Sequence, residues 1–269
     1  MTLSPQNAVS DKKSLRIALL HMAPRYDDLT DNLAMLERLI RYGSALGAEL
    51  ILAPELAVCG YEFYDKLGRD WIKEKGKAII DQFCRITHEN QVALVLGCPT
   101  YDAQLDTFHN SAIVIDEAGQ VAGTCHKQLV LPGSIEGWCN AGTEIRPVGW
   151  RGSKMGLLIC ADAYQPRIAE ELAKQGANVL ISLAAWAPGD HAPNGEWEQC
   201  TQAAGLYLYV CNRTGKSLLL NFEGSSSVVV INGRRHMEYT DPRPAILVVD
   251  VNPQTWQPQS TAFEIVHSK

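Results

Sequence analysis

The chain has 269 residues and a formal net charge of −6 at pH 7. This length fits one large domain or two small ones, and the negative charge argues against nucleic acid or an acidic membrane surface as the main partner. The longest apolar stretch, residues 179–187, is far shorter than the roughly 20 residues that cross a bilayer, so we expect no membrane partner.

The first fourteen residues are polar and contain no hydrophobic segment, so they do not resemble a secretory signal. We predict a flexible N-terminal tail over 1–14 and a single domain over 15–269, because no linker divides the rest of the chain. The eight cysteines are not dense in a chain of this length and include no CxxC pair. Reduced thiols in the cytoplasm are therefore expected.

Apolar runs and amphipathic stretches predict alternating strands and helices. In chain order, the expected elements are a strand at 15–22, a helix from 28–31 to about 47, a strand at 49–53, a helix at 75–90, strands at 92–97, 111–115, 121–124 and 155–159, a helix at 167–176, a strand at 178–183, a helix at 197–204, and strands at 206–211, 226–231 and 245–251. Many strands are apolar throughout, which suits sheets covered on both faces. The segment 116–120 indicates a hairpin turn, so the class is α/β with mixed sheets.

Three polar residues stand where predicted strands end. Glu55 follows the run 50–54, Lys127 follows 121–126, and Cys160 follows 155–159. An acid, an amine and a thiol are the groups needed for covalent attack on a carbon–nitrogen bond. Their positions therefore indicate a catalytic function.

Cys160 also has a plain structural interpretation, because buried cysteines at strand ends are common. Two features favour catalysis: the charged Asp162 comes directly after a buried strand, and Pro166-Arg167 begins a helix. A thiol on such a strand-to-helix turn has backbone N–H groups pointing at it, which favour the thiolate and can hold an oxyanion. Cys160 is therefore the candidate nucleophile.

The other polar residues have ordinary alternatives too. A glutamate at the position of Glu55 can point into solvent, and a lysine at a strand end usually extends its ammonium outward. An apolar loop, 128–133, leads from Lys127 to Glu136, so this lysine can instead point into a pocket. Glu136 can be a simple loop acid. The residues alone leave these alternatives open.

The order Glu…Lys…Glu…Cys, with its local contexts, resembles the nitrilase superfamily of carbon–nitrogen hydrolases over nearly the whole chain. The matching segments are Leu15-Arg16-Ile17-Ala18, Leu52-Ala53-Pro54-Glu55-Leu56 with Gly60-Tyr61, Asn110-Ser111-Ala112 with Asp116 and Gly119, 155–162 around Cys160, Asn212-Arg213-Thr214-Gly215, and Gly224-Ser225-Ser226. Each segment is a weak signal, whereas their common order and separation form a strong one.

The resemblance implies a four-layer α-β-β-α sandwich with two mixed sheets, which dimerises through the helices that flank the cysteine. It implies that Glu55 is the general base and that Lys127 stabilises the oxyanion with the backbone N–H of Ala161. Cys160 would be the nucleophile, and Glu136 would orient the substrate nitrogen or Lys127. No metal or organic cofactor is implied.

Four aromatic residues on loops after strands are candidates for the wall of the substrate pocket, although each can equally be a packing residue. They are Tyr61, Trp138, Tyr164 and Trp186. Two segments depart from the superfamily pattern: Ala203 stands where relatives carry an acid, and 137–140 does not follow the usual pattern of charged and aromatic residues. The choice of substrate therefore stays open.

Asp162 after the cysteine resembles the amidase and carbamoylase branches. The leading prediction is therefore a cysteine amidase that hydrolyses a small non-peptide amide to acid and ammonia through a thioester. An N-carbamoyl-amine hydrolase, which also releases carbon dioxide, is the next alternative, followed by a nitrilase. A binding or scaffold protein without turnover is the non-enzymatic alternative, against which the complete set of Glu55, Lys127 and Cys160 argues.

Histidines offer one further alternative. His126 beside Lys127 suggests a Cys–His pair like that of thiol proteases, although a lone histidine next to a strand is more often structural. His88, His109, His191 and His236 show no metal-ligand spacing, so zinc is not expected.

Overall fold

The computed structural model describes residues 14–130, 135–189 and 193–267. The predicted tail, 1–14, lies outside the described residues except for Ser14. All eight cysteines lie within the described ranges, where each is a free thiol. Within these ranges, no helix has both the length and the apolar character needed to cross a membrane.

Two mixed sheets form the centre of the molecule. The strands of sheet one are β1 (Leu15–His21), β2 (Leu50–Leu52), β3 (Ala93–Asp102), β4 (Thr107–Ile115), β5 (Val121–His126), β12 (Ala245–Val251) and β13 (Glu264–His267). Their order is β13-β12-β1-β2-β3-β4-β5. The β1/β2 and β2/β3 pairs are parallel, and the other neighbouring pairs are antiparallel.

Sheet two has the same mixed character. Its strands are β6 (Val148–Trp150), β7 (Ser153–Ile159), β8 (Val179–Ala184), β9 (Leu208–Asn212), β10 (Ser226–Ile231) and β11 (Arg234–Thr240). Their order is β11-β10-β9-β8-β7-β6. The pairs β7/β8 and β8/β9 are parallel, so these three strands end at the same edge.

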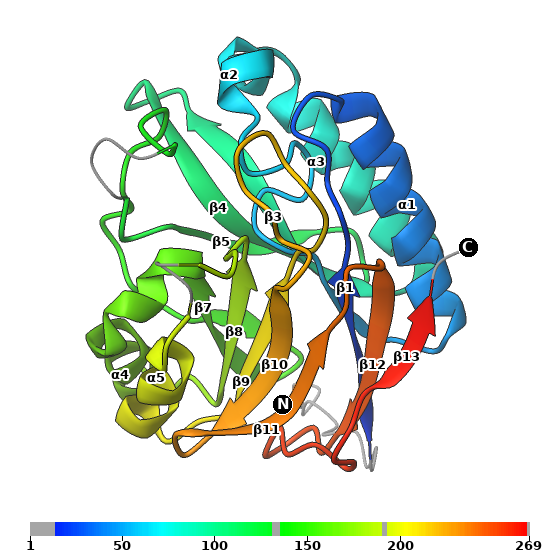
Figure 1. Cartoon of the computed structure of the whole chain (residues 1–269), viewed down its shortest axis with the longest axis vertical. Coiled ribbons are helices and arrows are strands. Elements are labelled where there is room, and N and C mark those ends of the chain that lie inside the picture. The colour runs from blue at the N-terminus through cyan, green and yellow to red at the C-terminus, as the bar shows by residue number, and fades with distance from the viewer. Residues whose placement is uncertain (1–13, 131–134, 190–192, 268–269) are drawn as a thin grey trace, which may run out of the picture.

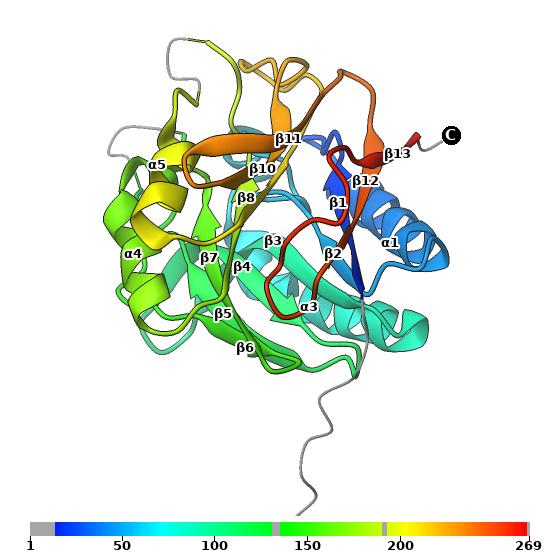
Figure 2. The same ribbon diagram turned by 90° about the horizontal axis from the view of Figure 1, so that it is seen from below.

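Four longer helices cover the outer faces of the sheets: α1 (Leu29–Ala45), α3 (Asp70–Asn90), α4 (Pro166–Lys174) and α5 (Glu196–Ala204). The described residues also include the short helix α2 (Tyr64–Leu67) and the 3₁₀ helix η1 (Cys160–Tyr164). Figures 1 and 2 show α1 and α3 on one side of the molecule and α4 and α5 on the other, with the sheets between them. The predicted four-layer α-β-β-α sandwich is confirmed.

The apolar strands bury both of their faces, as the sequence predicts. In β1, Ile17 and Leu19 join the core between the two sheets, while Ala18 and Leu20 join the core beneath α1 and α3. All four are at most 1% exposed. Successive side chains of a strand point to opposite faces, so a strand covered on both sides must be apolar at every position.

The helices also follow their sequence signals. The Asp28 side chain accepts the backbone N–H of Asp31 at 2.9 Å and so caps α1, whose buried face includes Leu36 and Ile40. The third helix begins at Asp70, five residues before the predicted start. The additional turn buries Trp71, whose ring packs on that of Phe63.

Four short or polar elements were not predicted: α2, β6, β11 and β13. The strand β11 contains only two buried residues, Met237 and Tyr239, because it lies at the edge of sheet two. The strand β13 is an edge strand with mostly exposed residues, and β6 and α2 have three and four residues. Such elements depend on neighbouring strands and helices more than on their own apolar periodicity.

The two sheets face each other where the parallel strands end. The thiol of Cys211 on β9 donates to the carbonyl oxygen of Leu52 on β2 at 3.2 Å. Residues just beyond the ends of β2, β7 and β8 therefore come from three strands to one region. That region contains Glu55, Cys160 and Ala185.

Candidate active site

Glu55 lies in the turn after β2 and is fully buried. The turn is held against β3, because Ala57 donates its N–H to the carbonyl oxygen of Gly97 at 2.9 Å. A Cβ atom at Gly97 would lie 2.1 Å from the carbonyl oxygen of Pro54, so only glycine permits this approach. Leu56 has a φ of +49°, a conformation that a bulky residue adopts only where its surroundings enforce it.

Lys127 comes directly after β5, and its side chain is also fully buried. Its backbone N–H donates to the carbonyl oxygen of Asn110 at 2.8 Å, and its own carbonyl oxygen accepts the N–H of Gly142 at 2.7 Å. The strand register therefore fixes the backbone of this lysine on both sides. Of the two orientations that the sequence leaves open, the Lys127 side chain has the buried one; it does not extend its ammonium into solvent.

Cys160 is the first residue of η1, directly after β7. Its φ of +46° lies in the left-handed region, and its exposed fraction is 5%. Asp162 fixes the turn, since one carboxylate oxygen accepts the N–H of Ile159 at 2.9 Å and the other accepts those of Gln128 and Leu129 at 2.9 and 2.8 Å. The hydrogen bonds of the buried Asp162 thus hold the strained backbone at Cys160 in place.

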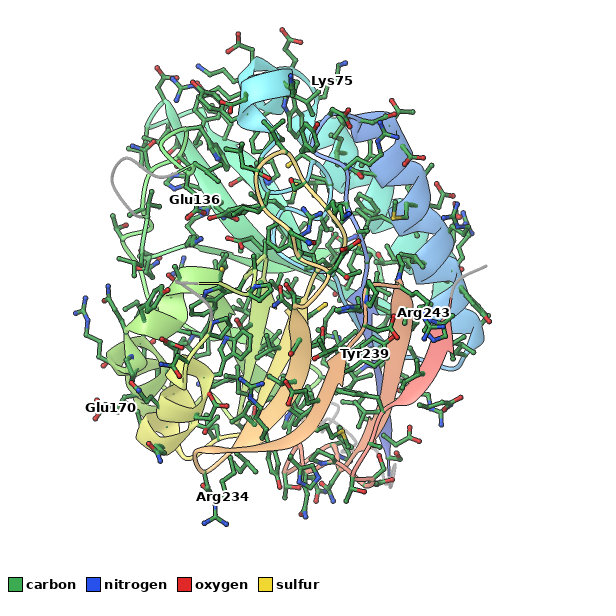
Figure 3. The ribbon with its side chains drawn as sticks, in the orientation of Figure 1. Lys75, Glu136, Glu170, Arg234, Tyr239 and Arg243 are labelled. Atoms are coloured by element: carbon green, nitrogen blue, oxygen red, sulfur yellow. The ribbon has the colours of Figure 1, made fainter. Side chains whose placement is uncertain are left out.

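Glu55, Lys127 and Glu136 form one hydrogen-bonded cluster; Glu136 is labelled in Figure 3. The Lys127 ammonium donates to Oε1 of Glu55 at 2.7 Å and to Oε1 of Glu136 at 2.6 Å. The same two oxygens accept hydrogen bonds from Nδ2 of Asn110 at 2.8 and 2.9 Å. Oε2 of Glu55 accepts the backbone N–H of Ala185 at 2.9 Å.

Asn110 has one unsatisfied atom. Its Oδ1 is buried and has no hydrogen-bond partner among the described residues. A buried acceptor of this kind costs about 1–3 kcal/mol. Exchanging the positions of Oδ1 and Nδ2 would not remove this cost. The acceptor Oδ1 would then face the two carboxylates that now accept hydrogen bonds from Nδ2.

Burial and neighbouring charges shift the pKa values of this cluster in opposite directions. Burial lowers the pKa of Lys127, but Glu55 and Glu136 outweigh that effect, so the pKa of the ammonium lies well above its ordinary value. Burial raises the pKa of Glu136, although Lys127 acts in the opposite direction. Lys127 is therefore positively charged at neutral pH.

The thiol of Cys160 lies within electrostatic reach of this cluster. Burial raises its pKa well above the ordinary value, and Glu55 adds to the increase. Lys127 and the backbone N–H of Ala185 lower that pKa without reversing the shift. The effect of backbone N–H groups on the thiol, which the sequence-based argument expects to favour the thiolate, is thus smaller than that of burial.

Three of the predicted pocket residues lie close to the cluster. Burial and the charge of Glu136 raise the pKa of Tyr61 well above its ordinary value. Tyr164 and Trp186 pack against each other with ring centroids 4.9 Å apart, and Tyr164 is 40% exposed. Trp186 is buried and follows Ala185 at the end of β8.

The fourth aromatic candidate, Trp138, and the predicted oxyanion donor, Ala161, are both buried. Ala161 directly follows Cys160 within η1. Trp138 is 1% exposed and packs on Phe63 with ring centroids 4.9 Å apart, within the core beneath α1 and α3. Its Nε1 has no hydrogen-bond partner in the part of the chain that the structure describes.

The two arginines near the motifs occupy different environments. Arg167 is exposed and donates to Oε1 of Gln165. Arg213 is fully buried, donates to the carbonyl oxygen of Pro24 at 2.9 Å, and stacks over the ring of Phe222. Arg213 thus joins loops that lie far apart in the sequence.

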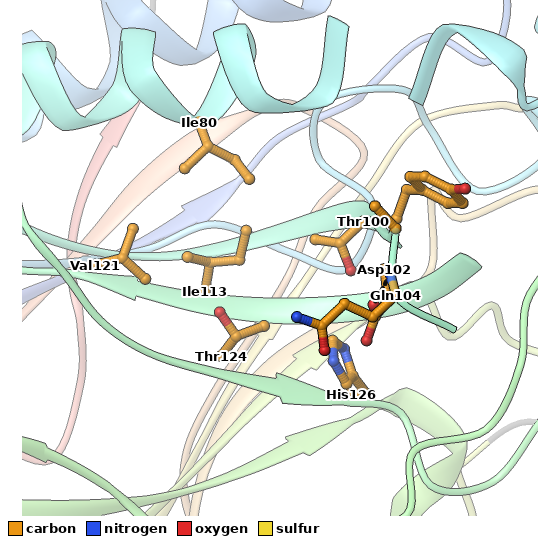
Figure 4. Close-up of a pocket in the computed structure, with 10 residues that line it drawn as sticks. Ile80, Thr100, Asp102, Gln104, Ile113, Val121, Thr124 and His126 are labelled. Atoms are coloured by element: carbon orange, nitrogen blue, oxygen red, sulfur yellow. Dashed lines mark hydrogen bonds between the residues drawn. The ribbon is translucent and has the colours of Figure 1, made fainter. Parts of the chain in front are cut away.

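His126 belongs to the opposite face of sheet one. Its Nδ1 contacts Oγ of Ser111 at 2.8 Å, and its ring stacks on that of His109 at 4.2 Å. His126 lines an open cavity of about 520 Å³ between α3 and sheet one, which Figure 4 shows with Ile80 and Ile113. Side chains alternate along β5, so Lys127 and His126 point to opposite faces, which argues against the Cys–His alternative.

Sequence reasoning missed two groups of the site. Asn110 was noticed only as part of a motif, although an amide inside a buried strand needs partners and so signals a polar site. The backbone N–H of Ala185 left no sequence signal, because any residue could supply it. Across the described ranges, no group of three or more His, Cys, Asp or Glu residues could hold a metal ion.

The arrangement can carry out acyl transfer. A buried thiol, a buried carboxylate and a buried ammonium can serve as the nucleophile, base and electrostatic stabiliser of such a reaction. Cys160 follows β7 at the end of sheet two where the parallel strands end. Each group comes from a different strand end.

Comparison with known proteins identifies the family. The family described as carbon-nitrogen hydrolase matches residues 16–260. The chain is 28% identical to N-carbamoylputrescine amidase of Arabidopsis thaliana over 82% of this chain and 81% of that protein. It is 25% identical to a probable nitrilase of Schizosaccharomyces pombe over 81% of each.

Solved structures give the same result. A cysteine-to-alanine mutant of the Nesterenkonia AN1 amidase, from the nitrilase superfamily, is 25% identical over 95% of both chains with a TM-score of 0.77. A glutamate-to-leucine mutant of that amidase, with a TM-score of 0.78 and 26% identity over 95% of both chains, carries the acetamide moiety of fluoroacetamide on its active-site cysteine. The chain therefore belongs to the carbon-nitrogen hydrolase family of the nitrilase superfamily and is a hydrolase of carbon–nitrogen bonds other than peptide bonds.

Proposed function

We propose that this hydrolase is an amidase that converts a small non-peptide amide to an acid and ammonia through a thioester on Cys160. The single observation that supports this proposal best is the buried Lys127 ammonium between Glu55 and Glu136, with the Cys160 thiol in electrostatic reach. A buried ion pair is seldom a net gain in stability, so its presence in the core favours a functional explanation.

The first step forms the thioester. Because the resting sulfur is protonated, Glu55 accepts the thiol proton as the sulfur attacks the amide carbon. Two of the three Lys127 N–H groups bind Glu55 and Glu136, and the third has no partner among the described residues. That N–H, with the backbone N–H of Ala161, stabilises the oxyanion of the tetrahedral intermediate.

The intermediate then loses its nitrogen. The carbon–nitrogen bond breaks, and Glu55 returns its proton to the departing amine, which leaves as ammonia. Water next attacks the thioester carbon while Glu55 takes a proton from it. The carbon–sulfur bond breaks, the sulfur regains the proton from Glu55, and the acid is released.

Glu136 and the aromatic residues have supporting roles in this proposal. Glu136 holds Lys127 and orients the substrate nitrogen. Tyr61, Tyr164 and Trp186 form a partly aromatic wall that restricts the substrate to a small amide. Trp138 supports this wall from the core.

Mass spectrometry of the intact protein tests the proposal. The protein is incubated with a pool of small amides, and an acyl adduct on Cys160 together with ammonia release is the expected result. Cys160→Ala should show neither. A parent that forms no adduct and releases no ammonia from any amide, carbamoyl compound or nitrile in the pool contradicts the proposal.

An N-carbamoyl-amine hydrolase is the second candidate, favoured by the likeness to the Arabidopsis N-carbamoylputrescine amidase. This reaction releases carbon dioxide along with ammonia, so a carbon dioxide assay separates it from amide hydrolysis. A nitrilase is third, and nitriles in the same pool test it.

The proposal includes a cytoplasmic homodimer or larger homo-oligomer that associates through α4 and α5. These helices lie side by side on the outer face of sheet two (Figure 1). Light scattering of the purified protein measures the mass in solution, and a monomer mass contradicts this part of the proposal.

A further inference from the structure

We infer that Asn110 is a positioning residue: its amide holds one oxygen of Glu55 and one of Glu136 beside Lys127, and leaves the second oxygen of Glu55 toward the Cys160 thiol. This inference rests on the proposed function, and it adds a residue to which no catalytic or binding role was assigned. Asn110 contacts neither the substrate nor the sulfur. It acts by holding the carboxylate of Glu55, the proposed base.

The two hydrogens of Nδ2 have separate carboxylate acceptors. One goes to Oε1 of Glu55 at 2.8 Å and the other to Oε1 of Glu136 at 2.9 Å. Lys127 donates to the same two oxygens, so Oε1 of Glu55 has two donors and is committed to the cluster. The proton acceptor for the thiol must then be the other oxygen, Oε2.

The surroundings of Oε2 agree with this assignment. It accepts the backbone N–H of Ala185 at 2.9 Å, and the same N–H also interacts with the sulfur of Cys160. The carboxylate oxygen and the thiol are thus neighbours of one backbone group. A rotation of the Glu55 carboxyl would break the contacts to Asn110, Lys127 and Ala185 together.

The backbone of Asn110 is as well fixed as its side chain. Its carbonyl oxygen accepts the N–H of Lys127 at 2.8 Å, and the residue pairs with Pro99 in the β3/β4 ladder. Its neighbours His109 and Ser111 are anchored on the opposite face, by the carbonyl oxygen of Asn140 and by Thr100. One residue therefore sets the positions of both acids and of the lysine.

The orphaned Oδ1 supports a functional explanation. Its burial without a partner among the described residues is unfavourable, and a leucine or a smaller residue would remove that penalty. In return, the Asn110 amide donates two hydrogen bonds, one to each of two carboxylates, which no apolar residue can do. The titratable groups in contact with Asn110 or with its two acceptors are Glu55, Glu136, Lys127 and Cys139.

Asn110→Asp tests the inference with almost unchanged shape. The substitution removes both donors and brings a third carboxyl to one lysine, so one of the three carboxyls must hold a proton near neutral pH. Alkylation of Cys160 by iodoacetamide, itself a small amide, is followed by peptide mass spectrometry between pH 5 and 9. The half-buried Cys84 serves as the internal reference thiol.

In the parent, Cys160 should react faster than Cys84 at pH 7, because Glu55 accepts its proton. In Asn110→Asp, the acidic limb of the Cys160 rate should move up by about one pH unit, so the rate should fall by up to about tenfold at pH values where the base is mostly protonated in both proteins. Asn110→Ser, which keeps one donor, should fall between the two. The Cys84 rate should not change in either variant.

Asn32→Asp is the matched control, because the fully buried Asn32 side chain bonds, among the residues that the structure describes, only to the backbone of Arg25. It should lower the melting temperature but leave the Cys160 pH profile unchanged. A Cys160 profile in Asn110→Asp equal to that of Asn32→Asp overturns the inference. A parent whose Cys160 reacts no faster than Cys84 overturns the proposed function itself, so the two failures are distinguishable.

Discussion

The carboxylate of Asp162 accepts the backbone N–H of Leu129 at 2.8 Å, and this contact joins the turn of Cys160 to the segment that follows Lys127. Two further backbone N–H groups donate to the same carboxylate at 2.9 Å. Asp162 thus sets the separation between the sulfur and the ammonium through backbone contacts, away from the reacting atoms.

We expect Asp162→Asn to weaken both stability and activity. The amide keeps the shape of the side chain but replaces one acceptor with a donor, so at least one buried N–H loses its partner. The free energy of unfolding should fall by about 1–3 kcal/mol. The value of kcat/KM should fall at least about tenfold, because a small displacement of reacting groups has a large effect. Urea unfolding and kinetics on the best amide measure both.

Asp116→Asn is the control for this prediction. Asp116 also accepts two backbone N–H groups, at 2.8 and 3.0 Å, but in the partly exposed hairpin between β4 and β5. Water can replace these contacts, so the loss of stability should be smaller and kcat/KM should not change. Equal effects of the two substitutions on kcat/KM would show that Asp162 has no special relation to the site.

The same carboxyl predicts a pH dependence of stability. Burial raises the pKa of Asp162 to about 6, above the ordinary value near 4 that it has in the unfolded chain. Because the folded protein binds this proton more tightly than the unfolded chain does, protonation of Asp162 stabilises the fold. This contribution to the unfolding free energy has its full value below about pH 4 and is lost as the pH rises through about 6. The advantage of the parent over Asp162→Asn in unfolding free energy should therefore be about 1 kcal/mol larger at pH 5 than at pH 7.5. Urea unfolding at both pH values tests this, and an advantage that grows with pH contradicts it.

Much of the fold could be predicted because apolar strands and amphipathic helices are local patterns. The strands at 226–231 and 245–251 match β10 and β12 at both ends. Edge elements could not be predicted, since β11 has a polar sequence and is a strand only because β10 provides its hydrogen-bond partners. The pairing of two sheets came from the resemblance, because contacts between distant strands leave no periodicity in the sequence.

The site was predictable only in part, for a related reason. Glu55, Lys127 and Cys160 are charged or nucleophilic residues at the ends of apolar runs, which is a visible anomaly. Their mutual distances depend on the register of several strands. The amide of Asn110 and the N–H of Ala185 complete the cluster through geometry that the sequence does not display.

Cys160 should remain a thiol across the neutral range. Its pKa lies well above the ordinary value, mainly through burial, so raising the pH from 6 to 9 should not ionise it in the resting protein. The ultraviolet difference spectrum between the parent and Cys160→Ala should show no thiolate band near 240 nm in this range. A band that titrates below pH 8 would show instead a preformed thiolate, and Glu55 would not be needed to remove the proton.

Gly97→Ala should disturb Glu55 directly. The added methyl group would lie 2.1 Å from the carbonyl oxygen of Pro54 and 2.8 Å from Cα of Glu55, so the backbone that carries the base must move. We expect a loss of about 1–3 kcal/mol in unfolding free energy, as for other overpacked positions, and a strong fall in kcat.

Gly76→Ala provides the contrast within the same protein. In α3, the nearest atom to an added Cβ at Gly76 is 3.7 Å away on Ile72, which is an ordinary contact. The substitution should raise the free energy of unfolding by about 0.5–1 kcal/mol, because alanine favours a helix over glycine. Activity should not change. A Gly97→Ala variant with parental kcat would show that the turn of Glu55 adapts easily.

Lys127→Met should reveal how strongly the buried charges depend on one another. Methionine fills a similar volume but leaves Glu55 and Glu136, both at most 1% exposed, without their cation. Removing one partner of a buried ion pair costs about 3–5 kcal/mol. Acyl-enzyme formation should also disappear, because the oxyanion loses its positive charge. Lys77→Met removes an equally short contact, 2.7 Å to Asp81, from a lysine that is 87% exposed, and should change stability by less than about 1 kcal/mol.

The loss in Lys127→Met should also depend on pH. Without the lysine, the two acids reduce their repulsion by binding a proton, and burial already raises the pKa of Glu136. Proton uptake by these acids stabilises the folded Lys127→Met variant at low pH. The loss of unfolding free energy relative to the parent should therefore be smaller at pH 5 than at pH 8. Chemical unfolding of the parent and both lysine variants at these pH values measures the effect. Equal losses for Lys127→Met and Lys77→Met would mean that water reaches the acids, and the closed, low-dielectric site on which the oxyanion argument depends would not exist.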